Sequence, residues 1–178
     1  MVERSFGDIP YNDLTGLLHR NRPEAHAANP ELNGSTKRIL LADDDEGVRD
    51  MGESVLPVYG NFEVDTAVDG EEAVTKFRQA HNSGRPYGAV MLDYNMPRKK
   101  GDEAAQEIRQ IEENVPIVLT PAAHNQFGFP SDEELAKSGV DLVLDKPDIA
   151  KDLEGSAMLI EELCHAEHPH SNGSNKAA

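Results

Sequence analysis

The feature that most constrains the fold is an alternation of short apolar runs and amphipathic stretches, which repeats five times between residues 37 and 165. Each repeat takes about 25 residues, which suits one strand followed by one helix. Strands that are separated by helices run parallel, because the chain must cross back over the sheet before the next strand begins. The sequence therefore predicts an α/β fold with a five-stranded parallel sheet and helices on both faces.

The predicted strands are the apolar or alternating runs at residues 39–42, 62–66, 89–92, 117–119 and 142–144. Apolar residues at helical spacing predict the helices: Val48, Met51 and Val55; Ala73, Val74 and Phe77; Ala104, Ile108 and Ile111; and, in one last helix, Ile149, Leu153, Ile160 and Leu163. Pro57 should end or kink the first helix. Ser131 and Glu134 form a capping box that should begin the fourth helix, and Gly139 should close it.

The two ends of the chain lack this pattern. Residues 1–36 are rich in proline, glycine and polar residues, so we expect a disordered extension, with a short helix at Leu14, Leu17 and Leu18 as the alternative. Residues 166–178 are expected to form a disordered tail. A chain of 178 residues has room for one domain, which we place at residues 37–165.

Charge and composition narrow the class of protein. Lys and Arg total 17 against 33 Asp and Glu, a formal net charge of -16 that disfavours direct binding of nucleic acid. No apolar run approaches the roughly 18 residues of a membrane span, and no signal-peptide core follows Met1. The single cysteine, Cys164, cannot form an internal disulfide. We therefore expect a cytoplasmic protein with no direct contact with a membrane.

Polar side chains follow four of the predicted strands. Asp43, Asp44 and Asp45 come after the first strand, Asp93 after the third, Thr120 after the fourth, and Asp145 and Lys146 after the fifth. In open parallel sheets, ligands bind beyond the carboxyl ends of the strands, so these groups should meet at one edge. Asp45 is expected to cap the first helix, and Asp145 is expected to be exposed.

Converging carboxylates repel one another unless a cation neutralises them. A set of oxygen ligands, with no His or Cys at these strand ends, suits a hard divalent cation such as Mg²⁺. Lys146 adds a compact positive charge that can pair with a carboxylate and then with a phosphoryl oxygen. Thr120 adds a hydroxyl group that can donate to the same oxygen.

Four ordered motifs resemble those of response-regulator receiver domains in two-component signalling. They are the residues from Ile39 to Asp45, those from Met91 to Pro97, the pair Leu119-Thr120, and Asp145-Lys146-Pro147; Gly101 also falls where that family keeps a glycine. The joint occurrence of the four motifs is far more specific than any one of them. The resemblance covers roughly residues 37 to 165 and implies a flavodoxin-like doubly wound sheet with strand order 2-1-3-4-5.

The resemblance also implies a role for each matching residue. Asp93 would take a phosphoryl group from a phosphohistidine. Asp44, Asp93 and the backbone carbonyl of Asn95 would bind Mg²⁺, with Asp43 acting largely through water. Lys146 would hold the phosphoryl group, and Thr120 would turn toward it and so report it to a partner. The implied partners are a histidine kinase or a histidine phosphotransfer protein, and an unknown downstream protein; a homodimer is left open.

The sequence departs from the family pattern at three places. Val143 stands where the family often has an aromatic switch residue, and Pro121 follows the threonine where a small flexible residue is usual. The segment from His124 to Pro130 is longer than is typical, and Phe127 and Phe129 in it either bind a partner or pack locally. These departures leave open how the signal leaves the site.

Two competing functions follow from these departures and from the site chemistry. A receiver-like module that binds partners without phosphate is the first, although the acidic set argues against it. An aspartyl-nucleophile phosphatase of the haloacid dehalogenase type is the second, but that family has a second aspartate where Asn95 stands. We expect no enzyme activity beyond the protein's own phosphorylation and dephosphorylation. Arg98, Lys99 and Lys100 are expected to form a solvated loop, with attraction of a phosphorylated donor as the alternative.

Overall fold

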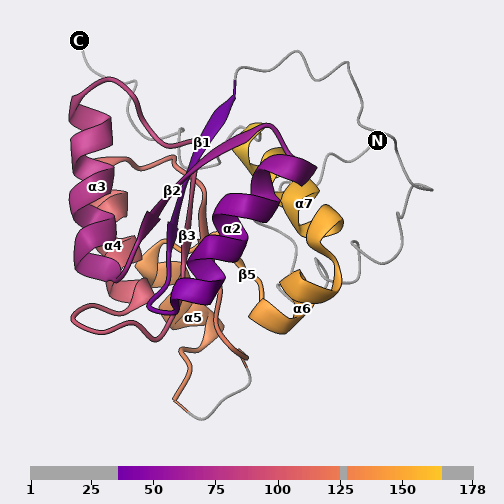
Figure 1. Ribbon diagram of the computed structural model, residues 1–178. Helices are drawn as coiled ribbons and strands as arrows, with labels where there is room; N and C mark the ends of the chain where they lie inside the picture. The colour runs from indigo at the N-terminus through magenta and orange to yellow at the C-terminus, as the bar shows by residue number, and fades with distance from the viewer. Residues whose placement is uncertain (1–35, 125–127, 166–178) are drawn as a thin grey trace, which may run out of the picture.

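The computed structural model describes residues 36–124 and 128–165 (Figure 1). Its sheet has the strand order β2-β1-β3-β4-β5, and every neighbouring pair is parallel, as the sequence predicted. The strands are β1 (Lys37–Ala42), β2 (Phe62–Ala67), β3 (Ala89–Leu92), β4 (Ile117–Leu119) and β5 (Leu142–Val143). The third and fourth strands have the predicted bounds, the first begins two residues earlier, and the fifth ends one residue sooner.

Helices cover both faces of the sheet (Figure 1). They are α2 (Glu46–Tyr59), α3 (Gly70–Asn82), α4 (Gly101–Ile111), α5 (Asp132–Ser138), α6 (Lys146–Lys151) and α7 (Leu153–His165). Alternate residues of β1 point to opposite faces: Leu40 packs with the side chains of α3, α4 and α5, whereas Ile39 packs with α2 and α7. The fold is therefore the doubly wound α/β sheet expected from the sequence.

The inward face of α2 differs from the prediction. Of the predicted residues, Val48 and Val55 are half-buried but Met51 is exposed, and the buried residues of α2 are Gly52 and Leu56. A β-carbon at Gly52 would lie 2.2 Å from Cδ2 of Leu41, so the helix lies close against β1 at this glycine. Pro57 does not end α2, which continues to Tyr59 before Gly60 donates its N–H to the carbonyl of Leu56.

The sequence predicted one last helix, but the structure has two, α6 and α7. Asp152 has a non-helical backbone, and its side chain accepts a hydrogen bond of 3.0 Å from the N–H of Gly155. An aspartate in this position ends one helix and caps the next, because its carboxylate satisfies an N–H that has no intrahelical partner. The predicted inward residues Ile160 and Leu163 are buried in α7, and Ile149 in α6 is half-buried against the same core.

Side-chain caps begin two of the helices on the α4 side of the sheet. Asp69 caps α3, and Ser131 with Glu134 forms the predicted capping box of α5. Gly139 ends α5 with φ of 78°, a left-handed conformation that glycine adopts without steric cost. Residues 1–35 of the predicted extension at 1–36, which include its leucine helix, and the tail at 166–178 lie outside the described residues.

Candidate metal and phosphoacceptor site

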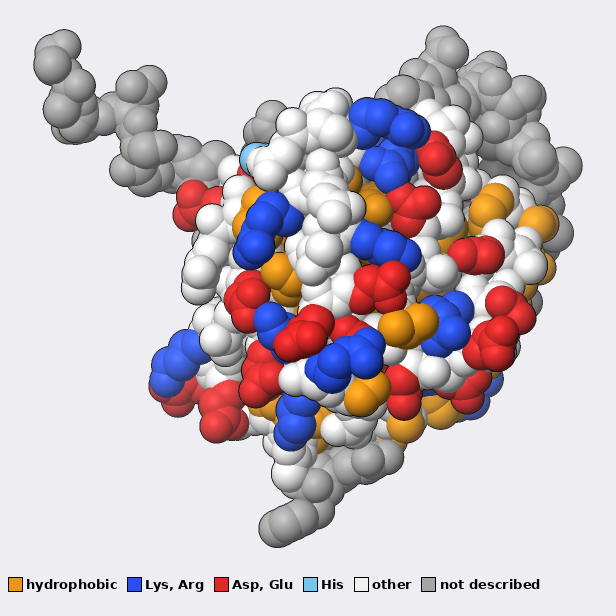
Figure 2. Space-filling model, turned by 60° about the vertical axis from the view of Figure 1, so that its left-hand side comes forward, with side chains coloured by type: hydrophobic (Ala, Val, Ile, Leu, Met, Phe, Trp, Pro, Cys, Tyr) orange, Lys and Arg blue, Asp and Glu red, His pale blue; other side chains and the backbone are white. Residues whose placement is uncertain are grey.

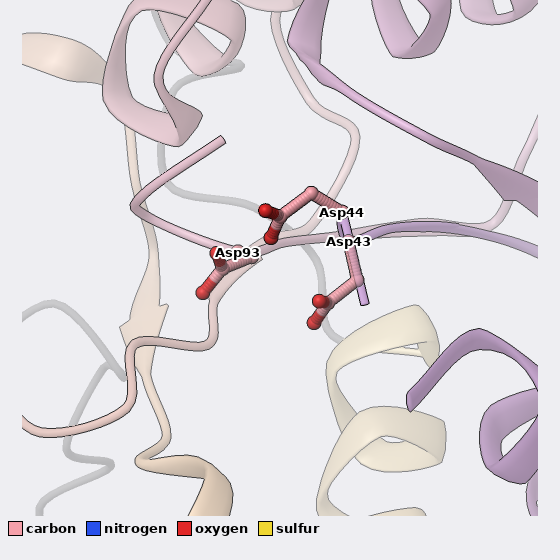
Figure 3. Close-up of side chains that lie close together, drawn as sticks. All are labelled: Asp43, Asp44 and Asp93. Atoms are coloured by element: carbon pink, nitrogen blue, oxygen red, sulfur yellow. The ribbon is translucent and has the colours of Figure 1, made fainter. Parts of the chain in front are cut away.

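Three carboxylates meet at the carboxyl ends of β1 and β3 (Figure 3). Asp43 and Asp44 follow β1 and Asp93 follows β3, and these two strands are paired side by side. One carboxylate oxygen of each residue lies within 4.8 Å of the others. Asp43 and Asp93 are buried and Asp44 is exposed, so the cluster has a closed side and a side open to solvent.

Lys146 bridges two of these carboxylates. Its Nζ lies 2.8 Å from Oδ2 of Asp43 and 3.0 Å from Oδ1 of Asp93. The backbone N–H of Lys146 donates to the carbonyl of Pro121 over 2.9 Å, which ties the start of α6 to the loop after β4. Burial works to lower the pKa of Lys146, but the hydrogen bonds to Asp43 and Asp93 outweigh it and raise the pKa. The ammonium group is therefore charged at neutral pH.

The carboxyl group of Asp93 has a raised pKa. Burial is the main cause, and repulsion by Asp43 and Asp44 adds to it, while the hydrogen bond to Lys146 opposes the shift. One ammonium group thus faces three carboxylates, which leaves an excess of negative charge in a mostly buried place. A hard cation with oxygen ligands would relieve that excess, so the donor set fits Mg²⁺.

Neighbouring residues hold Asp43 in place. Its Oδ1 accepts a hydrogen bond of 3.0 Å from the N–H of Asp45, and its carbonyl accepts one of 2.8 Å from the guanidinium of Arg49. Asp45 itself caps α2 by accepting from the N–H of Gly47 over 2.7 Å, as predicted. No sequence pattern predicts the contact of Arg49, which depends on how α2 lies against the end of β1.

The family to which this chain belongs follows from a match to a family model. The model of the response regulator receiver domain matches residues 39–156, which is most of the described part and includes the three carboxylates and Lys146. This chain belongs to the response regulator receiver family. Receiver domains of this family act in two-component systems, as signalling domains that interact with histidine kinases or phosphotransfer proteins.

Known proteins resemble this chain both in sequence and in structure. The receiver is 35% identical over 144 residues to a probable transcriptional regulator, ycf27, of Cyanophora paradoxa, covering 78% of this chain and 55% of that protein. It is 31% identical to the response regulator TrrA of Thermotoga maritima, solved with Mg²⁺ and beryllium fluoride, with a TM-score of 0.57 over 70% of this chain and 98% of that one. The chain spans about half the length of the curated relatives that it matches first.

A third relative is the receiver domain of the histidine kinase CKI1 from Arabidopsis thaliana, also solved with Mg²⁺ and beryllium fluoride. It is 28% identical, with a TM-score of 0.58, and the match covers 73% of this chain and 91% of that one. Both solved relatives therefore hold the kind of ion that the carboxylate cluster of this receiver fits.

The remaining candidate residues of the receiver lie at the same edge of the sheet. Thr120 follows β4, is 2% exposed, and donates its N–H to the carbonyl of Leu92 over 2.7 Å. Asn95 lies exposed in the loop after Asp93. Pro121 is buried, and Val143 packs partly buried against the core that includes α4 and α5.

The prediction that Asp145 is exposed is wrong. Only 13% of its side chain is accessible, because the loop after β4 folds back over it. One carboxylate oxygen accepts from the N–H of His124 over 3.0 Å, and the other lies 2.8 Å from Nδ1 of the same histidine. This contact joins the loop after Thr120 to the residue next to Lys146.

The aromatic residues of the long loop divide between described and undescribed parts. Phe129 packs partly buried against the core, with its ring edge-on to Tyr94 at 4.9 Å between centroids, as the local-packing alternative expects. Phe127 lies outside the described residues. Tyr94 directly follows Asp93, so Phe129 contacts the neighbour of the phosphoacceptor candidate.

Arg98 and Lys100 are exposed, as expected for a solvated loop, and Lys99 is half-buried, but each of these three cations has a partner. Arg98 pairs with Asp69, Lys99 pairs with Glu107, and Nζ of Lys100 lies 5.2 Å from the ring centroid of Tyr94. On the face of the receiver shown in Figure 2, basic side chains are interspersed with acidic ones. In the described part of the chain, no helix combines the length and the apolar character needed to cross a membrane.

Proposed function

We propose that this receiver is a phosphorylation-dependent signalling switch or phosphorelay intermediate, with Asp93 as the phosphoacceptor. The observation that carries the proposal is the bridge from Lys146 to Asp93 and Asp43, with Asp44 beside it. Phosphoryl transfer needs positioning and charge neutralisation more than covalent chemistry from the protein. This arrangement supplies the positioning, and Lys146 together with the cation that the carboxylates would hold supplies the neutralisation.

The reaction is a displacement at phosphorus. A carboxylate oxygen of Asp93 forms the new P–O bond while the P–N bond of a phosphohistidine breaks, and the histidine nitrogen keeps the electron pair. Asp44, Asp93 and the carbonyl of Asn95 would hold Mg²⁺, with Asp43 acting largely through water. When bound, Mg²⁺ neutralises the charge that develops on the phosphoryl oxygens. Lys146 is placed to leave its ion pair with Asp93 for one of those oxygens.

Output would pass through partner binding. The phosphoryl donor would be a histidine kinase or a histidine phosphotransfer protein, and the receiver would act in the cytoplasm, where such donors present their phosphohistidine. The hydroxyl of Thr120 would turn toward the phosphate and so change the outer face of β4 and β5. Val143 gives this receiver no aromatic side chain at the usual reporter position, so the signal must leave through another contact.

The test is modification by acetyl phosphate, with and without Mg²⁺, read by intact mass. We expect magnesium-dependent addition of one phosphoryl group to the wild-type protein and to Asp50→Asn, which makes the same change at an exposed carboxylate on α2. We expect none in Asp93→Asn. Beryllium fluoride should shift amide resonances of the wild-type protein under the same conditions. Retained acid-labile phosphate in Asp93→Asn would contradict the assignment.

The departure at Val143 favours one alternative, a receiver-like module that binds its partner without phosphate. A well-folded protein that neither takes phosphate nor responds to beryllium fluoride would support that module. The phosphatase alternative would require steady hydrolysis of small phosphate esters. Asn95 stands where that chemistry needs its second carboxylate.

A further inference from the structure

The loop that joins β3 to α4 begins at Asp93 and holds a strained turn. The N–H of Gly101 donates to the carbonyl of Tyr94 over 3.0 Å, which closes the base of the loop. Near its tip the N–H of Lys99 donates to the carbonyl of Pro97 over 2.7 Å, which makes a three-residue turn centred on Arg98. Arg98 has φ of 63°, and within residues 36–124 and 128–165 no other non-glycine residue has a positive φ. Such turns are rare, and the surrounding structure must hold them.

The partner that holds this turn is Asp69, which is fully buried. Its Oδ1 accepts a hydrogen bond of 2.9 Å from the N–H of Glu72 and so caps α3. Its Oδ2 is also buried and pairs with the guanidinium of Arg98. A buried carboxylate is costly unless a cation or several donors neutralise it. The ion pair therefore satisfies Asp69 and binds the loop to the start of α3 at the same time.

A second contact seats the loop on the same helix. A β-carbon at Gly70 would lie 2.6 Å from the carbonyl oxygen of Lys99, so the backbone next to Arg98 lies directly against the first residue of α3. Nε of Arg98 also lies 4.0 Å from a carboxylate oxygen of Glu71. Three consecutive residues at the start of α3 thus contact the tip of the loop.

We propose that Arg98 is a positioning residue for the magnesium site, which acts through its ion pair with Asp69 to fix the loop after Asp93. This inference rests on the proposed function. Asn95, whose carbonyl is assigned to the ion, lies between Asp93 and the strained turn, on a segment fixed at its base by Gly101 and at its tip by Arg98. Without the ion pair the strained turn would relax, and the loop would present the Asn95 carbonyl in several places rather than one.

The test is the affinity for Mg²⁺ alone, measured by amide NMR shifts in the absence of any phosphoryl donor. Arg98→Gln removes the ion pair and keeps a side chain at the strained position. Removal of a positive charge from an acidic protein would by itself strengthen attraction of a cation. We expect the opposite result, an affinity about 10-fold weaker, the lower end of what loss of an outer partner of a metal site costs.

Arg85→Gln is the matched control. Arg85 lies beyond the other end of α3, where its guanidinium pairs with Glu63 over 3.6 Å and its side chain is exposed. This variant removes the same charge without touching the loop, so its affinity should equal that of the wild-type protein or slightly exceed it. Arg98→Lys keeps a cation within reach of Asp69 and should restore most of the affinity. The exchange of the Lys99 N–H with solvent should be faster in Arg98→Gln without metal.

The outcomes separate this inference from the proposed function. A folded Arg98→Gln protein with the affinity of the wild-type protein would overturn the role of Arg98 and leave the phosphoacceptor site standing. A wild-type protein that binds no Mg²⁺ and takes no phosphate would overturn both. Loss of global stability in Arg98→Gln, with unchanged Mg²⁺ affinity of the folded protein, would show that the ion pair serves only the fold.

Discussion

The α-carbon of Gly101 lies against the backbone carbonyl of Asp93, so closely that a β-carbon at position 101 would come within 2.3 Å of that oxygen. It would also come within 2.7 Å of Cδ1 of Leu119. Gly101 begins α4, so its lack of a side chain lets this helix start directly over the residue that carries the proposed chemistry. The glycine is therefore required by space, and its φ is not in the left-handed region.

Gly101→Ala should lower the free energy of unfolding by about 1–3 kcal/mol, because the obstructing atom is backbone and cannot turn aside. Urea denaturation measures the change. Gly88→Ala is the control, since a β-carbon there would meet other atoms at 3.5 Å or more, an ordinary contact distance. We expect that variant to stay within about 0.5 kcal/mol of the wild-type protein. Equal stability of the two variants would show that α4 can shift away from Asp93.

The strand bounds that the sequence predicted best are those of strands whose residues are all buried. Residues 89–92 and 117–119 are continuous apolar runs, and both strands have the predicted bounds. The inward face of α2 was mispredicted because Gly52, which has no side chain to count, occupies the closest approach to Leu41. Hydrophobic periodicity counts Met51 instead, although its side chain is exposed.

The same distinction holds for the site: contacts that follow from the order of the strands could be predicted, and contacts between loops could not. Asp43, Asp44, Asp93 and Lys146 could be predicted to meet, because parallel strands bring their carboxyl ends to one edge. The pair of Arg98 with Asp69 could not, since it joins two loops whose conformations no local pattern specifies. The burial of Asp145 was missed for the same reason, because it depends on where the loop after β4 lies.

Arg109 should contribute strongly to stability from outside the site. Its guanidinium donates to the carbonyls of Glu113 and Val115 over 2.6 and 2.7 Å, to the carbonyl of Gly139, and to the carboxylate of Asp141 over 2.8 Å. Lysine cannot reproduce this fork of donors, so Arg109→Lys should cost about 2–3 kcal/mol in unfolding free energy. The same change at exposed Arg78 should have no measurable effect in the same urea titration. A small loss at Arg109 would mean that water replaces the lost donors.

The thiol of Cys164 should be inert in the folded protein. Burial in the core beside α2 and α7 raises its pKa to about 11. Because the thiolate is the reactive form, alkylation by iodoacetamide at pH 8 should be about 100-fold slower than in urea-unfolded protein, since the pKa lies about two units above the ordinary value of 9.0. The raised pKa favours the neutral thiol in the folded state, so its contribution to stability is complete below about pH 9 and is lost as pH rises toward 11. Equal alkylation rates in the two states would show that the end of α7 opens freely.

Lys146→Met should separate two effects of the Lys146 ammonium group: it neutralises the buried carboxylates, and it repels Mg²⁺. Without Mg²⁺ the variant leaves Asp43 and Asp93 buried without their cation, which should lower the unfolding free energy by about 2–3 kcal/mol, less than for a fully buried pair because Lys146 is partly exposed. Saturating Mg²⁺ should narrow the difference, since the ion neutralises the same carboxylates and no longer meets the repulsion of the ammonium group. The variant should therefore bind Mg²⁺ more tightly than the wild-type protein, the reverse of Arg98→Gln, although each change removes one positive charge.

Acetyl phosphate should nevertheless modify Lys146→Met more slowly, because the phosphoryl oxygens lose their partner. Lys137→Met, which breaks an ion pair between exposed side chains, is the control for stability. If Mg²⁺ affinity fell in both site variants, Lys146 would have to be assigned to holding the site together rather than to neutralising its charge.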